Sequence, residues 1–276
     1  WEPIGAGPDP SLDIPENPFT GTYNGATFKI SNLRVAGSTK TSYKGLFGYI
    51  RNATIQNIDC HNVSIDCEDA SVGAIVGRMI NSSLSNSKVS GLVKSTSFQI
   101  GGLVGWSEGS TLSNCYSSAN VEAGDMSVGG LVGVQGSNSK IQNSWSSGVV
   151  TGLKRVGGVL GYNSNGTVQN CYSSSSVSGE NTIGGLIGYS SGTSSSILNC
   201  YAVGSVSAIQ YGGGLIGIKA SGGDPVSSYW NIESCGQSTS GGGAGKLTTE
   251  MLINSNYTGW DFTGVWDIQE GVTYPY

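Results

Sequence analysis

The chain has 276 residues, of which 45 are glycine, and only 11% are charged, giving a formal net charge of −5. Its 13 basic residues are scattered along the sequence, which argues against a nucleic-acid partner, because phosphate binding needs clustered positive charge. No apolar run is long enough to cross a bilayer, so we expect no transmembrane segment in this chain. The composition is typical of a soluble β protein.

The first 27 residues are irregular and rich in proline and aromatic residues. They end in an Asn-Gly turn at Asn24 and Gly25. Because the end of an array of stacked strands exposes unpaired edges, we predict that residues 1–27 form an N-terminal cap and lead-in. The chain begins at Trp1 without the pattern of a signal peptide, so we expect a mature or trimmed segment.

Residues 28–230 contain seven copies of a tetrapeptide of the form Gly-Leu-x-Gly, whose closing glycines are 29, 28, 28, 28, 27 and 29 residues apart. A fixed period of this length indicates stacked repeats. Both middle positions are apolar, although successive strand residues point to opposite faces. Either one row faces outward, where a second chain could cover it and allow self-association, or the glycines bend the backbone and turn both rows inward. The copies begin at positions 45, 74, 102, 130, 158, 185 and 214, with alanine replacing the first glycine at 74.

An asparagine lies about nine residues or slightly more after each of the first six tetrapeptides, and Asn32 is an earlier copy. Stacked coils bring equivalent residues to about 4.8 Å from one another, so each side-chain amide can bond to the next in an asparagine ladder. The alternative is that asparagine serves only as a good turn residue. The predicted ladder residues are Asn32, Asn57, Asn86, Asn114, Asn143, Asn170 and Asn199.

Each repeat has a third apolar position after the asparagine. Runs of Ser, Gly, Asn and Thr separate the tetrapeptide, the asparagine segment and this third position, which predicts three short strands and three turns in each repeat. We therefore predict an all-β fold, a right-handed parallel β-helix of about seven coils with N- and C-terminal caps. The third position is occupied by Val63, Val89, Val121, Val149 or Val150, Val177 and Val206.

An aromatic side chain recurs two residues after the ladder asparagine. If this row faces outward, it is a rigid stacking platform for sugar rings or for a protein partner. If it faces inward, the rings fill a corner of the core. The row consists of Tyr116, Trp145, Tyr172, Tyr201 and Trp230.

Six cysteines are present. Cys115, Cys171 and Cys200 directly follow a ladder asparagine, and we predict that they are free and buried. Cys60 and Cys67 are close in sequence and form the better candidate for a disulfide. The spacing of a zinc site is absent, and we expect neither a metal nor a cofactor.

An enzymatic role has little support in the sequence. His61 is the only histidine, so a protease triad would have to include it, and the paired histidines of zinc peptidases are missing. The acidic residues Asp59, Asp66, Glu68 and Asp69 form one cluster, which is typical of a solvated turn rather than of a calcium or catalytic site. A polysaccharide lyase or glycosidase is the remaining enzymatic alternative.

The last stretch, residues 231–276, ends in several aromatic residues and is predicted to be a C-terminal cap. The tetrapeptides, the Asn-Cys-Tyr tripeptides at 114–116, 170–172 and 199–201, and Trp260-Asp261-Phe262 with Trp266 together resemble the GLUG-motif proteins of bacterial surfaces. The resemblance covers about residues 19–270.

The resemblance implies an extracellular or bacterial cell-surface location and an adhesin-like role, without implying an activity. Such repeats also occur as non-catalytic parts of IgA-specific metallopeptidases. Two functions are expected from it: a non-enzymatic adhesion module that binds a host or matrix glycan or protein, or a structural spacer within a larger secreted protein.

Overall fold

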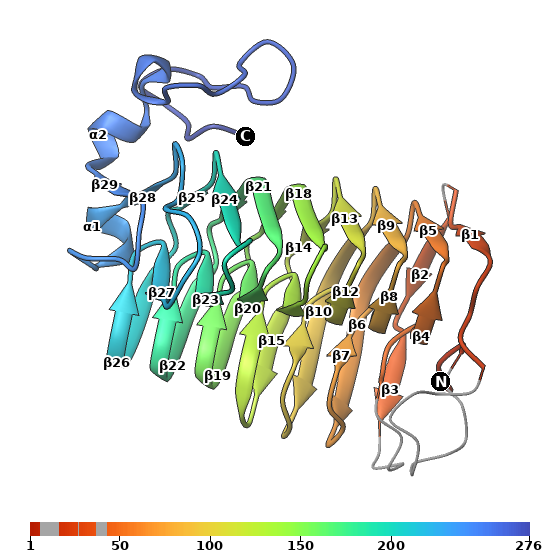
Figure 1. Ribbon diagram of the computed structural model, residues 1–276. Coiled ribbons are helices and arrows are strands. Elements are labelled where there is room, and N and C mark those ends of the chain that lie inside the picture. The colour runs from red at the N-terminus through yellow and green to blue at the C-terminus, as the bar shows by residue number, and fades with distance from the viewer. Residues whose placement is uncertain (6–16, 27, 37–42) are drawn as a thin grey trace.

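The computed structural model describes residues 1–5, 17–26, 28–36 and 43–276. Over these residues the chain winds into a parallel β-solenoid in which equivalent strands of successive coils lie side by side (Figure 1). Val104 pairs with Val76 and Val132, and Leu112 pairs with Leu84 and Ile141. The predicted all-β solenoid of about seven coils is confirmed. Pro8, Pro10 and Pro15 of the predicted cap lie outside the described residues.

The Gly-rich motif opens one sheet, to which each coil contributes a single strand. We call it the glycine-motif sheet. Its seven described strands are β4 (Phe47–Arg51), β8 (Val76–Ile80), β12 (Val104–Glu108), β17 (Val132–Gln135), β20 (Leu160–Ser164), β23 (Ile187–Ser191) and β27 (Ile216–Lys219).

The rest of each coil belongs to a larger sheet. This sheet bends at a corner where the asparagine that recurs from coil to coil lies. Strands before or across this corner are β1 (Thr22–Asn24), β5 (Thr54–Gln56), β9 (Ser83–Ser85), β13 (Thr111–Ser113), β18 (Lys140–Ser146), β21 (Thr167–Ser173) and β24 (Ser196–Leu198). Strands that follow it early in the chain are β2 (Lys29–Ser31), β3 (Arg34–Ala36), β6 (Asp59–Cys67), β7 (Val72–Gly73), β10 (Lys88–Ser95), β11 (Ile100–Gly101), β14 (Tyr116–Ser117), β15 (Asn120–Ala123) and β16 (Met126–Gly129). Those that follow it in the later coils are β19 (Val149–Gly157), β22 (Ser176–Gly184), β25 (Tyr201–Ala202), β26 (Val206–Gly213) and β28 (Tyr229–Asn231).

Both apolar rows of the tetrapeptide point into the core. Leu103 and Val104 are fully buried, and so are their equivalents in the other coils. The backbone bends at the glycines before the strand begins, and a Cβ on Gly102 would lie 2.2 Å from the carbonyl oxygen of Gly130 in the next coil. The bend, rather than the missing Cβ, turns both side chains inward, because Ala74 holds the position of Gly102 in the second coil and Ile75 and Val76 are buried there as well. The alternative of an outward apolar row is therefore wrong, and it offers no surface for self-association.

The third apolar row is shifted in the early coils. Val121 pairs with Val93 and Val150, and Val93 pairs with Ile65. Val63 and Val89, which the sequence placed in this row, lie opposite Gly91 and Cys60 instead. The reason is that the pairing of β10 with β6 shifts register between Val89 and Gly91.

The N-terminal residues cover the first coil. Ile4 bridges to Phe47, and β1 pairs with β5, so a strand of the stack lies within the predicted cap. The rings of Phe19 and Tyr23 pack on Phe47 with centroid separations of 5.2 and 5.4 Å. These contacts shield the apolar end of the core from water.

The C-terminal residues do two things. First, α1 (Ile232–Cys235) and β29 (Ala244–Lys246), which pairs with β28, continue the last coil and cover its open end. Then α2 (Thr248–Met251), the 3₁₀ turn η1 (Asn254–Asn256) and the residues up to Tyr276 fold back along the side of the solenoid (Figure 1). The segment 247–276, which we call the return segment, therefore covers a side face as well as following the end. Among the described residues, no helix has the length and apolarity needed to cross a bilayer.

Candidate binding site

The asparagine corner is set by backbone conformation. Six of the predicted ladder residues have φ between 49° and 58°, a left-handed conformation that asparagine tolerates better than most residues. Amide-to-amide hydrogen bonds run from Asn199 to Asn170 (3.3 Å) and from Asn170 to Asn143 (3.0 Å). From Asn57 to Asn143 the described side chains form no such bond. The asparagines thus share one backbone role, and a hydrogen-bonded ladder extends over three of them. The six are Asn57, Asn86, Asn114, Asn143, Asn170 and Asn199.

The assignment of Asn32 to this ladder is wrong. Its neighbour Ser31 pairs with His61, and the Asn62 amide donates to Asn32 Oδ1 over 2.7 Å. Asn32 therefore lies at a different corner of the first coil. The position equivalent to Asn57 is held by Gly25, whose N–H donates to Gln56 O.

The aromatic row lies on the outer surface of the solenoid. Along β21, Cys171 and Ser173 are buried while Tyr172 between them is half-buried, so the ring points away from the core. Neighbouring rings stack along the solenoid axis: Tyr116 on Trp145 at 3.7 Å, and Trp145 on Tyr172 at 5.3 Å with 6° between the planes. Because the rings cover one another's faces, the row presents ring edges to a ligand rather than an open stacking platform.

The last predicted member of the row, Trp230, is not part of it. Tyr229 pairs with Tyr201, whereas Trp230 lies opposite Ala202, is buried, and donates from Nε1 to Gln237 O. The sequence signal that identifies Tyr229 is Ser228. Its hydroxyl accepts from the N–H of Cys200, as Ser144 does from Cys115 one position before Trp145.

The return segment covers one end of the row. Trp260 and Trp266 pack against Tyr201 at 6.1 and 6.0 Å, and the Tyr201 hydroxyl donates to Pro275 O. Burial, and then the neighbouring tyrosines, hold the pKa of Tyr201 well above its ordinary value. Burial, followed by the nearby Tyr116, raises the pKa of Tyr172 to about 12. These hydroxyls stay protonated at neutral pH.

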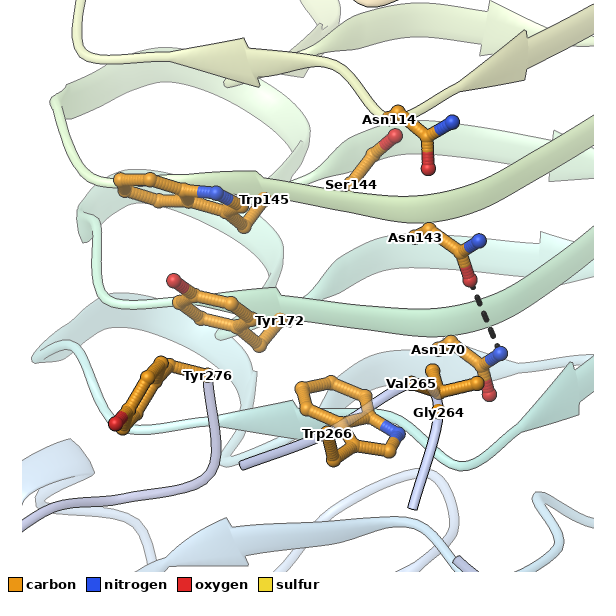
Figure 2. A pocket seen from close by; sticks show the side chains of 10 residues that line it. All are labelled: Asn114, Asn143, Ser144, Trp145, Asn170, Tyr172, Gly264, Val265, Trp266 and Tyr276. Atoms are coloured by element: carbon orange, nitrogen blue, oxygen red, sulfur yellow. Dashed lines mark hydrogen bonds between the residues drawn. The ribbon is translucent and has the colours of Figure 1, made fainter. Parts of the chain in front are cut away.

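A hollow of about 490 Å³ opens where this cover ends, and we call it the row hollow. Figure 2 shows its two walls: the solenoid side carries ring edges and corner amides, and the return segment supplies the other side. Its volume falls in the range of ligand pockets. The lining residues are Asn114, Asn143, Ser144, Trp145, Asn170, Tyr172, Gly264, Val265, Trp266 and Tyr276.

Among the residues that line this hollow, Trp266 has a side-chain hydrogen-bond donor without an acceptor in the described part of the chain. It is only 6% exposed, and its Nε1 is a buried donor without a hydrogen-bond partner among the described atoms. A buried indole N–H usually has a partner, and leaving one unpaired costs about 1–3 kcal/mol. The ring centroid of Trp260 lies 4.4 Å from that of Trp266, and Trp260 Nε1 donates to Ser227 O over 2.8 Å. The Trp266 N–H is therefore closed to solvent beside the hollow and has no acceptor among the described atoms.

The acidic residues expected in one solvated turn are divided: Asp59 and Asp66 lie on β6, and Glu68 and Asp69 lie in the turn that follows it. Asp59 Oδ2 lies 3.2 Å from Lys88 Nζ, and Asp69 Oδ2 forms a buried ion pair with Lys44 Nζ at 3.8 Å. His61 Nδ1 shares a hydrogen bond with the Ser90 hydroxyl. In the part of the chain that the structure describes, no group of three or more His, Cys, Asp or Glu side chains is placed to hold a metal ion.

All six cysteines are free and buried. The candidate disulfide between Cys60 and Cys67 does not form: both thiols are free, and they lie near opposite ends of β6. Burial raises the pKa of the thiols of Cys60, Cys115 and Cys235 to about 12. These thiols are packing groups.

Taken together, the fold and this surface define a parallel β-solenoid with a ligand-sized hollow beside an outward aromatic row. The family model of the GLUG motif matches residues 96–122, 152–178 and 179–207. The chain therefore contains GLUG-motif repeats. No curated protein shows significant similarity to it.

A solved structure with a similar fold is a protein from Bacteroides ovatus that is provisionally described as an immunoglobulin A1 protease. The two chains share 20% sequence identity with a TM-score of 0.63, over 100% of this chain and 80% of that one. At this identity the likeness concerns the fold alone.

Proposed function

We propose that the protein is a non-enzymatic extracellular module of a bacterial surface, which adheres to a host or matrix glycan or protein through the row hollow. The observation that carries the proposal is the hollow itself, in which the corner amides of Asn114, Asn143 and Asn170 lie beside ring edges of the aromatic row. The location rests on the GLUG repeats and on the bacterial protein of similar fold.

The chemistry of the hollow suits a polyhydroxylated or amide-bearing ligand. The corner amides of Asn114, Asn143 and Asn170 line it at successive coils, and each amide offers both donors and an acceptor. The edges of Trp145 and Tyr172 supply apolar contact beside them. Few polar groups placed among aromatic surface are typical of small-ligand sites.

The same lining disfavours catalysis. Among the described residues around the row hollow there is no Asp, Glu, His, Lys or Cys, and the raised pKa of Tyr172, about 12, makes it a poor proton donor or acceptor near neutral pH. A hydrolase or lyase would need such groups within reach of the substrate. This supports the binding function over the enzymatic alternative.

A spacer function is the second candidate. Its support is that the rings of the aromatic row cover one another's faces, which stiffens the stack whether or not a ligand is bound.

The test is a screen of the purified chain on glycan and matrix-protein arrays, followed by titration of the best ligand. Trp145→Ala removes the ring edge at the centre of the hollow and is expected to weaken binding at least tenfold. Ile209→Ala removes a side chain that is 78% exposed on β26 and lies outside the hollow, so it should bind normally. Equal binding by both variants would place adhesion elsewhere, and no ligand on either array would favour the spacer.

A further inference from the structure

The outer face of the glycine-motif sheet carries a second row of large side chains, separate from the aromatic row. Strand pairing aligns one outward position in every coil. At six of the seven positions the side chain is aromatic, an arginine or an isoleucine. The fourth position holds the smaller valine. In order the residues are Tyr49, Arg78, Trp106, Val134, Tyr162, Tyr189 and Ile218.

Arginines alternate with the rings on both sides of this valine. The Arg78 guanidinium lies 4.1 Å from the Trp106 ring and donates to the Tyr43 hydroxyl over 2.8 Å. The Arg155 guanidinium lies 4.9 Å from the rings of both Tyr162 and Tyr189. Such cation–π contacts hold the rings in place. Trp106 and Tyr162 are therefore two supported walls with a gap between them.

The gap is a hollow of about 420 Å³, which we call the Val134 slot; it is lined by Trp106 and Tyr162, with Val134 and Gly136 between them. The walls are two coils apart, which corresponds to about 9.6 Å. Apolar contact at about 3.5–4.0 Å from each wall leaves the thickness of one puckered six-membered ring. The slot fits a single pyranose better than a pair of stacked rings.

The two ends of the slot differ in charge. Arg155 lies at the corner before β20, has a left-handed backbone with φ 54°, and has no carboxylate within ion-pair distance among the described residues. Glu108, the last residue of β12, lines the slot from the far end of the strands. The Nε1 of Trp106 is a buried donor that no described atom accepts from. The slot thus offers a cation at one end and a carboxylate acceptor at the other, while the indole N–H of its Trp106 wall is closed to solvent.

We propose that the Val134 slot binds one acidic pyranose unit, with its carboxylate on Arg155, a hydroxyl on Glu108, and its ring between Trp106 and Tyr162. Arginine suits this role because its planar guanidinium pairs with a carboxylate through two parallel hydrogen bonds. The site is independent of the row hollow and goes beyond the adhesion proposed there.

The test compares a methyl glucuronide with the matching methyl glucoside, which differs only in lacking the carboxylate, by calorimetric titration and saturation-transfer NMR. The methyl glycoside of N-acetylneuraminic acid is measured in parallel. We expect an acidic sugar to bind at least tenfold more tightly than the glucoside. Arg155→Gln should abolish that difference.

Val134→Tyr fills the slot with a side chain that neighbouring coils already carry at the same position, so the strand should accept it, and it should abolish binding. Val134→Ala keeps the slot open and should bind within about threefold of the unmodified chain. Trp145→Ala, in the row hollow, should leave this binding unchanged, which separates the two proposals.

Three results would overturn the inference: no binding of either acidic sugar, equal binding of the glucoside, or full binding by Val134→Tyr. If circular dichroism shows that Val134→Tyr does not fold, Arg155→Gln decides the question, because an unchanged preference for the acidic sugar would exclude the slot.

Discussion

Trp266 and Trp260 give a matched test of whether the buried Trp266 N–H is unpaired. Both indoles belong to the same cluster, they are 6% and 8% exposed, and their ring centroids are 4.4 Å apart. They differ in one respect: Nε1 of Trp260 donates to Ser227 O, and Nε1 of Trp266 has no described partner. Replacement by phenylalanine removes the N–H from each and a similar amount of ring surface.

The expected free energies of unfolding differ because of the hydrogen bond. Trp260→Phe loses a net contribution of about 1 kcal/mol. Trp266→Phe removes an unpaired buried donor that costs about 1–3 kcal/mol, which offsets the ring surface it loses. Since the lost surface cancels between the two variants, Trp260→Phe should be less stable than Trp266→Phe by about 2–4 kcal/mol.

The assay is urea denaturation followed by near-ultraviolet circular dichroism, with hydrogen exchange of residues 247–276 to detect local opening of the return segment. Equal destabilisation of the two variants would refute the reasoning, because it would mean that the Trp266 donor is already satisfied in the free protein.

Two further predictions concern the scaffold. Gly133→Ala would place a Cβ 2.6 Å from the backbone of Gln99 and Ile100 and should lower the free energy of unfolding in urea by about 1–3 kcal/mol. Gly102→Ala should lower it by less, because Ala74 occupies the equivalent position naturally. The reverse order of the two variants would contradict this account. Alkali should destabilise the fold: raised pKa values near 12 for Cys115 and Tyr172, against ordinary values of 9.0 and 10.0, mean that the folded state holds these protons more tightly. Their contribution is complete below about pH 9 and is lost as the pH rises towards 12, so a urea midpoint that stays constant from pH 8 to pH 11.5 would disprove it.

The solenoid itself could be predicted because its signal is repeated. A period near 28 residues fixes which residues lie over one another, and the parallel pairing of Val104 with Val76 and Val132 follows from it. Local geometry was harder. The inward turn of both Leu103 and Val104 comes from a bend at Gly102 and Leu103, directly before β12, which alternation along a strand does not reveal.

The candidate sites were only partly predictable. The outward direction of Tyr172 follows from its place between Cys171 and Ser173 once the asparagine corner is known. The shift from Trp230 to Tyr229 arose because the last coil has Ser227, with φ 45°, where earlier coils have asparagine. Contacts of the return segment with Tyr201 join residues more than 50 positions apart, and no repeat announces them. The Val134 slot was missed because its defining feature is a small residue among large ones on a face that was expected to be apolar.

The row on the glycine-motif sheet also bears on how such a protein can change its ligand. Its members point away from the core, whereas the residues that specify each coil, such as Leu103 and the closing Gly133, point inward or touch backbone. Recognition and folding are thus encoded by separate residues. One exchange of a small for a large side chain along the row would create, erase or relocate a gap by one coil, so diversification of specificity need not endanger the architecture beneath it.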